Sequence, residues 1–338
     1  VRPPLSGGPN IPPTLAPVPT IVPTAVSLPE LRQLTTGGCC VNPAWSPDSK
    51  QVLFIDKPAK DAPAGIYAIG VTATLSQRPQ VIGRVGIYSP DRSLIAYRDS
   101  GQTIVENLKT GTLSIIPNGG HEVSFAPDDK HIAWEVEAIS GPYDQRENNI
   151  YLANADGSDA ARMTKIYGGG LIGWLPQGLK AVFIGRPSLA VQTSTLTLLD
   201  LKTNVAVDLV SAERLGGVSI SNGGTWLAYY ITFNADKTRN GIWLQRTDGS
   251  QGRQLDQWGA YQWRDDLQLL LIPQRTTANR PFDVYEIEAA SGESKLLIDG
   301  ALTPLNIFNG DWRVSPDGQY IVFLNSLDRN LWLVKLPD

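Results

Sequence analysis

A repeating alternation of short apolar runs and polar turns extends along most of the chain. One unit begins with an apolar run that ends in Trp45 and continues into the turn Ser46-Pro47-Asp48. A second apolar run follows, Val52-Leu53-Phe54, and then a variable loop, a third run, a Gly-containing turn and a fourth run. Runs of this length, rich in β-branched and aromatic residues and bounded by Pro, Asp and Gly, predict short β-strands joined by tight turns.

The turn recurs seven times along the chain, at intervals of 37 to 51 residues. Its third position is occupied in order by Pro47, Pro90, Pro127, Pro176, Asn222, Asp265 and Pro316. Such intervals are typical of a four-stranded propeller blade. The pattern therefore predicts an all-β fold, a seven-bladed β-propeller of four-stranded antiparallel blades over residues 28–338.

The two ends of the repeat indicate how the ring closes. The last unit stops after its third strand, at Pro337-Asp338. An unassigned segment, Leu31-Arg32-Gln33-Leu34-Thr35, precedes the first unit and matches the outer-strand residues Arg253-Gln254-Leu255 of the fifth. We expect this N-terminal strand to pair into the last blade, because such closure removes exposed strand edges.

The units resemble the WD40-like repeat of the TolB family, which also occurs in the propeller domains of prolyl-oligopeptidase-type peptidases. Val314-Ser315-Pro316-Asp317-Gly318 matches its turn, and Ile132-Ala133-Trp134 matches its second strand. The resemblance covers residues 28–338 and implies a β-propeller. Propellers of TolB itself have six blades and a second domain, so seven blades without that domain depart from the family. This repeat specifies a fold and leaves the function open.

Proline dominates the N-terminal segment. Nine of the 25 prolines lie within the first 29 residues. Because proline fixes φ and lacks a backbone donor, we expect residues 1–27 to form an extended linker. Such spacers are common in tethered proteins, which favours an extracytoplasmic protein, periplasmic or on the cell surface, held through a segment upstream of Val1. We also expect this linker to contact a protein partner.

The charge balance bears on the class of partner. The chain carries 29 basic and 33 acidic residues, a net charge of −4, and its Lys and Arg form no dense cluster. Nucleic-acid binding needs concentrated positive charge, so we expect no nucleic-acid partner. No apolar stretch approaches the roughly 18 residues of a membrane-spanning helix. A direct membrane span is therefore not expected.

Few residues are suited to catalysis or metal binding. Cys39 and Cys40 are adjacent, which fits no metal-binding pattern, so they form either a strained vicinal disulfide or two unpaired thiols. The only histidines, His121 and His131, have no further ligand at metal-binding spacing, and no Gly-x-Ser-x-Gly motif is present. The recurring turn aspartates are interpreted as turn formers. We therefore expect no catalytic residue, no metal, no cofactor and no enzymatic activity.

Two surfaces remain as candidate binding sites. The long loops on one face of the ring are where such a scaffold can carry recognition. Candidate partner-binding residues in these loops are Tyr143, Arg146, Arg186, Arg239, Arg280 and Arg329. The second surface is the mouth of the central channel, where His121, Glu122, Asp311 and Trp312 begin innermost strands.

Three functions are compatible with these features. The sequence favours a non-catalytic, extracytoplasmic propeller that acts as a protein-interaction or accessory subunit of a larger, membrane-associated assembly. One alternative is a propeller that binds or processes glycans in its central pocket. A second alternative is a periplasmic sensor of a small ligand.

Overall fold

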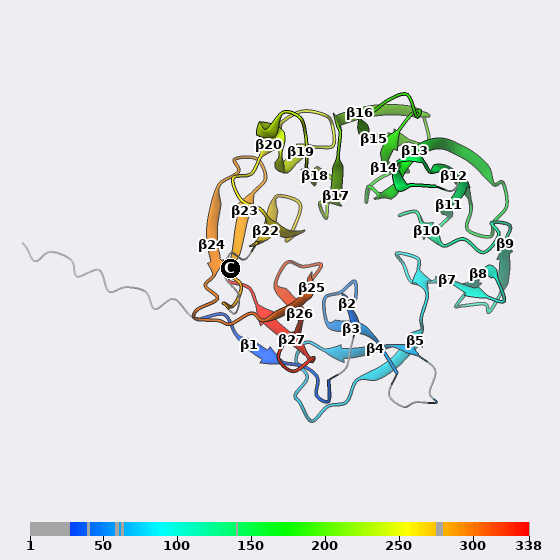
Figure 1. The fold of residues 1–338 in the computed structure, drawn as a ribbon. Helices are drawn as coiled ribbons and strands as arrows, with labels where there is room; N and C mark the ends of the chain where they lie inside the picture. Colours follow the sequence, from blue (N-terminus) through cyan, green and yellow to red (C-terminus); the bar gives the residue numbers. More distant parts are fainter. Residues whose placement is uncertain are drawn as a thin grey trace, which may run out of the picture.

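The computed structural model describes residues 28–38, 41–57, 61, 64–139, 141–274 and 280–337. Twenty-seven β-strands in this part of the chain form six antiparallel sheets, which are arranged as a ring (Figure 1). Two short 3₁₀ helices, η1 (Tyr143–Gln145) and η2 (Lys237–Arg239), lie in the loops. No helix of the described residues is long and apolar enough to cross a membrane. The all-β propeller expectation is confirmed.

Five of the sheets have four strands each. The first contains β2 (Val41–Trp45), β3 (Gln51–Asp56), β4 (Gly65–Gly70) and β5 (Gln80–Arg84), and the second contains β6 (Ile87–Tyr88), β7 (Leu94–Asp99), β8 (Gln102–Asn107) and β9 (Leu113–Ile116). A third contains β17 (Leu215–Ile220), β18 (Trp226–Ile231), β19 (Gly241–Arg246) and β20 (Gly252–Gln254). A fourth contains β21 (Gly259–Trp263), β22 (Gln268–Pro273), β23 (Val284–Glu288) and β24 (Ser294–Ile298). The last contains β25 (Ile307–Val314), β26 (Tyr320–Asn325), β27 (Leu331–Lys335) and β1 (Leu31–Gln33).

The sixth sheet has seven strands and replaces two of the expected blades. It contains β10 (Val123–Phe125), β11 (His131–Ile139), β12 (Glu147–Asn154), β13 (Ala161–Trp174), β14 (Lys180–Arg186), β15 (Ser194–Asp200) and β16 (Val205–Ala212). The first half of β13 pairs with β12, and its second half pairs with β14. The expectation of seven four-stranded blades is therefore wrong, because the ring has five four-stranded blades and one seven-stranded sheet.

Glycines explain why β13 remains continuous where a break between blades was expected. Gly168 adopts a φ of +59°, which bends the strand without ending it. A Cβ atom at Gly169 would collide with the Ile184 carbonyl oxygen, so only glycine allows β14 to approach this closely. The 14-residue strand therefore passes from one half of the sheet to the other without leaving the hydrogen-bonded ladder.

The ring closes through its N-terminal strand. β1 pairs antiparallel with β27, with Leu31 opposite Val334 and Gln33 opposite Trp332. Beyond β1, the Leu34 N–H donates to the Leu331 carbonyl at 2.8 Å. Leu34 is only 1% exposed and packs in the core between the last and first sheets. The N-terminal segment thus supplies the outer strand of the last sheet, as its resemblance to an outer strand predicts.

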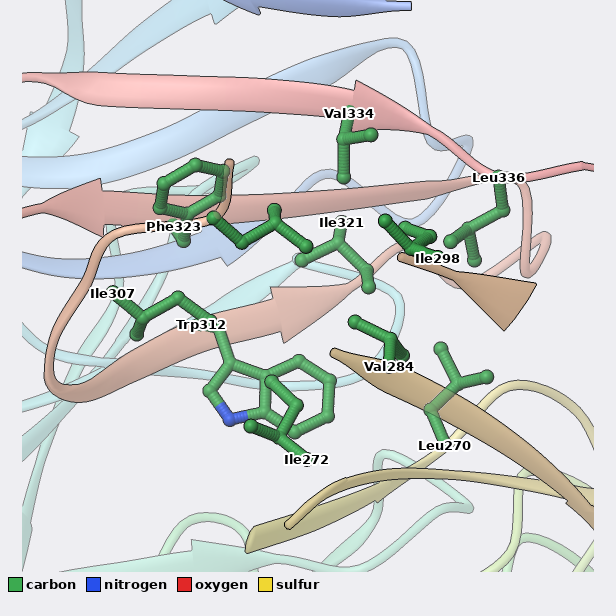
Figure 2. Packing of buried hydrophobic residues seen from close by; sticks show 11 residues of the cluster. Leu270, Ile272, Val284, Ile298, Ile307, Trp312, Ile321, Phe323, Val334 and Leu336 are labelled. Atoms are coloured by element: carbon green, nitrogen blue, oxygen red, sulfur yellow. The ribbon is translucent and has the colours of Figure 1, made fainter. Parts of the chain in front are cut away.

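The core of the ring lies between neighbouring sheets. Figure 2 shows one such cluster, in which Ile272 and Val284 pack against Trp312, Ile321 and Phe323 of the next sheet. Alternate residues of each strand point to opposite faces, so each middle strand contacts both of its neighbouring sheets. The apolar strand residues are therefore used in sheet-to-sheet packing, and binding is left to the strand ends and the loops.

The recurring turns are confirmed as structural elements that also connect neighbouring sheets. In the turn after β6, Ser89 donates to Asp91 at 2.8 Å, and Asp91 accepts the Ser93 N–H at 2.8 Å. The hydrogen bond from the Ser93 backbone is the largest of the contributions that lower the pKa of Asp91 to about 2. The Asp91 N–H in turn donates to Asp129 in the next turn at 2.9 Å.

A buried ion pair ties the sheet of β21–β24 to the last sheet. Arg264 pairs with Glu286 on β23, and also donates to the carbonyls of Gly318 at 3.0 Å and Pro337 at 2.8 Å. Lys295 Nζ lies 2.7 Å from the other Glu286 carboxylate oxygen. Burial alone would raise the pKa of Glu286, but the hydrogen bonds from Lys295 and Arg264 outweigh it and lower the pKa below 4.5.

Ring closure predicts a measurable role for Leu34. We expect Leu34→Ala to lower the free energy of unfolding by about 2–5 kcal/mol, the usual cost of truncating a buried leucine. Leu28→Ala is the matched control, because Leu28 is 59% exposed, and it should change the free energy by less than about 0.5 kcal/mol. Urea denaturation measures both. Equal destabilisation by the two variants would contradict closure through this strand.

The buried ion pair predicts a pH dependence of stability. Because the pKa of folded Glu286 is below the ordinary 4.5, its stabilising contribution is complete above that value and is lost as the pH falls through the lowered pKa. We expect Glu286→Gln to cost about 3–5 kcal/mol near neutral pH, since Arg264 then loses its buried partner. The gap from the parent protein should narrow well below pH 4.5 in urea denaturation. The exposed Glu293→Gln is the control, and an unchanging gap would contradict the assignment.

Candidate functional site

A pocket of about 600 Å³ lies where the innermost strands of four sheets end. We call it the central pocket, and it is lined by Ala44, Trp45, Asn222, Trp263, Arg313, Val314, Ser315 and Pro316. These residues belong to β2, β21, β25 and the turns after β17 and β25, so four of the six sheets of Figure 1 contribute to the pocket. The pocket thus combines two indole rings, one guanidinium, one amide and one hydroxyl.

The tryptophans of the central pocket also bridge neighbouring sheets. Trp45 Nε1 donates to the Arg313 carbonyl at 3.1 Å, and Trp263 Nε1 donates to the Ser219 carbonyl at 3.3 Å. Each indole N–H therefore already has a partner in the sheet beside it. Trp45 remains half-buried whereas Trp263 is 5% exposed. Trp45 is the better placed of the two to offer an aromatic face to a ligand.

Arg313 is the charged group of the central pocket. Its side chain is exposed, and its Nη1 donates to the Trp312 carbonyl at 2.7 Å. No carboxylate of the described residues lies within ion-pair distance of it, although other arginines such as Arg246 and Arg280 have such partners. A guanidinium stays protonated and binds carboxylates through two parallel hydrogen bonds. The pocket therefore presents an uncompensated positive charge suited to a carboxylate.

A second pocket of about 590 Å³ lies between the start of β21, the end of β22 and the strand β25. Its wall is largely apolar and contains Trp258, Phe282 and Trp312. The buried Gln257 Oε1 beside Trp258 has no hydrogen-bond partner in the described part of the chain. This second pocket has aromatic surface but no charged group among its lining residues.

The expected channel-mouth residues differ in their surroundings. Trp312 is 2% exposed, packs in the core cluster of Figure 2 and lines the second pocket. Asp311 is half-buried, His121 is half-buried with its carbonyl accepting from Thr103 at 2.6 Å, and Glu122 is exposed. None of the four lines the central pocket.

The expected partner-binding residues differ in exposure. Tyr143 is 65% exposed in η1, and Arg146, Arg280 and Arg329 are also exposed. Arg146 pairs with Glu137, Arg280 pairs with Asp283, and Arg329 stacks on Phe308, whereas Arg239 donates to the Ser211 carbonyl. Arg186 is only 7% exposed, so it does not belong to the outer surface of the loops. Cys39, Cys40 and the linker of residues 1–27 lie outside the described residues.

Sequence reasoning missed two chemically distinctive groups. Arg313 follows a buried tryptophan in β25, and its position after Trp312 was the only available signal. Glu135 interrupts the apolar run of β11 and accepts a hydrogen bond from the Leu171 N–H. Burial raises the pKa of Glu135, although that hydrogen bond opposes the shift. Within the described residues, no group of three or more His, Cys, Asp or Glu side chains could hold a metal ion.

Comparisons with known proteins show the fold. No family model and no curated protein sequence matches this chain. An oligogalacturonate lyase in complex with manganese is 14% identical, with a TM-score of 0.61 over 92% of this chain and 97% of that one. An oligogalacturonate lyase from Vibrio parahaemolyticus is 10% identical, with a TM-score of 0.59 over 92% and 98%. The β-propeller domain of the Trilobed protease from Pyrococcus furiosus is 12% identical, with a TM-score of 0.54 over 92% and 99%.

These neighbours correct the functional expectation. The sequence favoured a non-catalytic accessory subunit and no enzymatic activity, yet two chains that share this fold over almost their full length are lyases. The expectation was wrong because it equated the absence of familiar catalytic motifs with the absence of activity. The glycan-directed alternative agrees better with these neighbours.

Proposed function

We propose that this protein binds acidic oligosaccharides, of the uronate class, in its central pocket. The observation that carries the proposal is the Arg313 guanidinium in the same pocket as Trp45, because it has no carboxylate partner among the described residues. A guanidinium and an aromatic face are complementary to a sugar that bears a carboxylate, because the cation pairs with the acid and the indole packs on the apolar face of the ring.

The comparisons supply independent support for this substrate class. Two of the structures similar to this chain are lyases of oligogalacturonate, a polymer of sugar acids. In the cleavage of such a chain by elimination, a base takes the proton from the carbon next to the carboxylate, a carbon–carbon double bond forms, and the bond to the leaving sugar oxygen breaks. A positive charge paired with that carboxylate makes the proton more acidic, since it stabilises the charge that develops. In this proposal Arg313, which lines the central pocket, supplies that charge to a bound uronate.

Two further expectations remain proposals beside this one. Membership of the TolB-like repeat family is supported by the recurring Ser-Pro-Asp turns and by the propeller fold. An extracytoplasmic location is supported by the Pro-rich segment of residues 1–27.

Calorimetric titration with oligogalacturonate tests the binding site. Arg313→Gln keeps the size and polarity of the side chain but removes its charge, so we expect affinity to fall roughly tenfold or more. Binding of the parent protein should also weaken as salt is added. The neutral oligogalactose should bind both forms equally weakly.

Arg280→Gln is the matched control, because Arg280 is an exposed arginine of the loops that pairs with Asp283. It should leave the affinity unchanged. Loss of binding in Arg280→Gln but not in Arg313→Gln would transfer the site to the loops, and no binding by the folded parent protein would reject the proposal. Ultraviolet absorbance of an unsaturated product, followed in the same samples, measures whether the bound chain is also cleaved.

A further inference from the structure

A separate cavity of about 320 Å³ opens within the seven-stranded sheet. We call it the side cavity. Its walls come from the first half of β13 and from β14, β15 and β16, and they include Phe183, Arg186, Leu199 and Asp208. None of its lining residues belongs to the central pocket. With a water occupying about 30 Å³ of liquid, the side cavity has room for about ten groups of that size.

The side cavity contains a buried cation with an incomplete set of partners. Arg186 is 7% exposed, and its Nη1 donates to the Val191 carbonyl at 3.2 Å. Its Nη2 is buried and has no hydrogen-bond partner in the described part of the chain. No carboxylate among those residues lies within ion-pair distance of the guanidinium, unlike the half-buried Arg264, which pairs with Glu286. A buried charge is costly unless an opposite charge and hydrogen bonds compensate it.

The other charged groups of the side cavity are already engaged. Lys165 lies 3.5 Å from Glu147, and Asp208 accepts a hydrogen bond from Thr197 at 2.8 Å. Arg186 is therefore the group that a ligand would satisfy. The nearby Asp208 carboxylate would repel a second negative charge, so a ligand with one carboxylate suits the cavity better than a polyanion.

The other residues that line the side cavity indicate the chemistry of the rest of the ligand. Met163, Ile166, Phe183 and Leu199 supply apolar surface beside the guanidinium. Thr195 and Thr197 are paired with Ser211 and Asp208 on β16, so these hydroxyls are held in place. Apolar walls around one oriented charged group are typical of small-molecule sites.

We propose that the side cavity binds a small monocarboxylic acid with an apolar body, whose carboxylate pairs with Arg186. The acid enters between β13 and β16, and its apolar part displaces water from Phe183 and Leu199. This site is independent of the central pocket, so its test does not depend on the proposed glycan function.

Calorimetric titration of the full chain with hexanoate and benzoate tests the proposal, with hexanamide and benzamide as neutral analogues. The acids should bind and the amides should bind at least roughly tenfold more weakly, because a hydrogen bond between two charged groups is stronger than one to a neutral amide. Arg186→Gln should abolish this preference for the acid. Equal binding of acids and amides, or no binding of either acid, would overturn the proposal.

A second pair of variants keeps Arg186 in place. Ala206 is an exposed residue of β16 that lines the side cavity, so Ala206→Trp should fill it and reduce the affinity for the acids by roughly tenfold or more. Val207 is 43% exposed and points to the other face of the same strand. Val207→Trp should therefore leave the affinity unchanged. Equal affinities of the Ala206→Trp and parent proteins would place any bound acid outside the side cavity.

Discussion

Burial of one sheet's face against the face of the next sheet is the interaction on which the rest of the ring depends. Val52 and Phe54 of the first sheet share a cluster with Val322 and Leu333 of the last sheet, and Leu34 completes it. A four-stranded sheet alone would leave both of these faces in water, at a cost that grows with the apolar area exposed. The sheets are therefore stable as a closed set, which explains why the chain uses β1 to complete its last sheet.

The same constraint determines where binding can occur. Middle strands are used in packing between sheets, so polar and charged groups reach the surface at the strand ends. Trp45 shows the transition between the two roles, because its N–H joins two sheets while part of its ring faces the central pocket. Arg313 lies one residue beyond the buried Trp312, so the backbone that anchors the core also holds the guanidinium. The rigid ring thus holds a few binding side chains in position. The loops that carry these side chains therefore need little order of their own.

Much of the fold could be predicted from local sequence patterns, whereas the binding groups could not. The Ser-Pro-Asp turns and the outer-strand likeness of Leu31–Thr35 are short-range signals, and each identified an element that the structure contains. The continuity of β13 depends on how closely the Ile184 carbonyl approaches Gly169, which local pattern does not report. Arg186 was expected in the long loop after the second strand of its unit, and only the packing of four strands around it reveals its burial. Whether a charged side chain is paired depends on which other groups the fold brings within ion-pair distance. An unpaired charge can therefore be recognised only in the assembled structure.

The shared strand β13 makes one junction of the ring different from the others. In the rest of the described chain, neighbouring sheets contact each other through side chains and loops and share no strand. The two halves of the seven-stranded sheet share one backbone ladder, and they cannot rotate apart unless hydrogen bonds of β13 break. The Ile184 carbonyl at Gly169 and the Glu135 carboxylate at Gly170 occupy the space of a Cβ atom, so a larger residue at either position would have to displace them. This arc of the ring is therefore held by backbone hydrogen bonds, whereas the other junctions depend on side-chain packing and loop contacts.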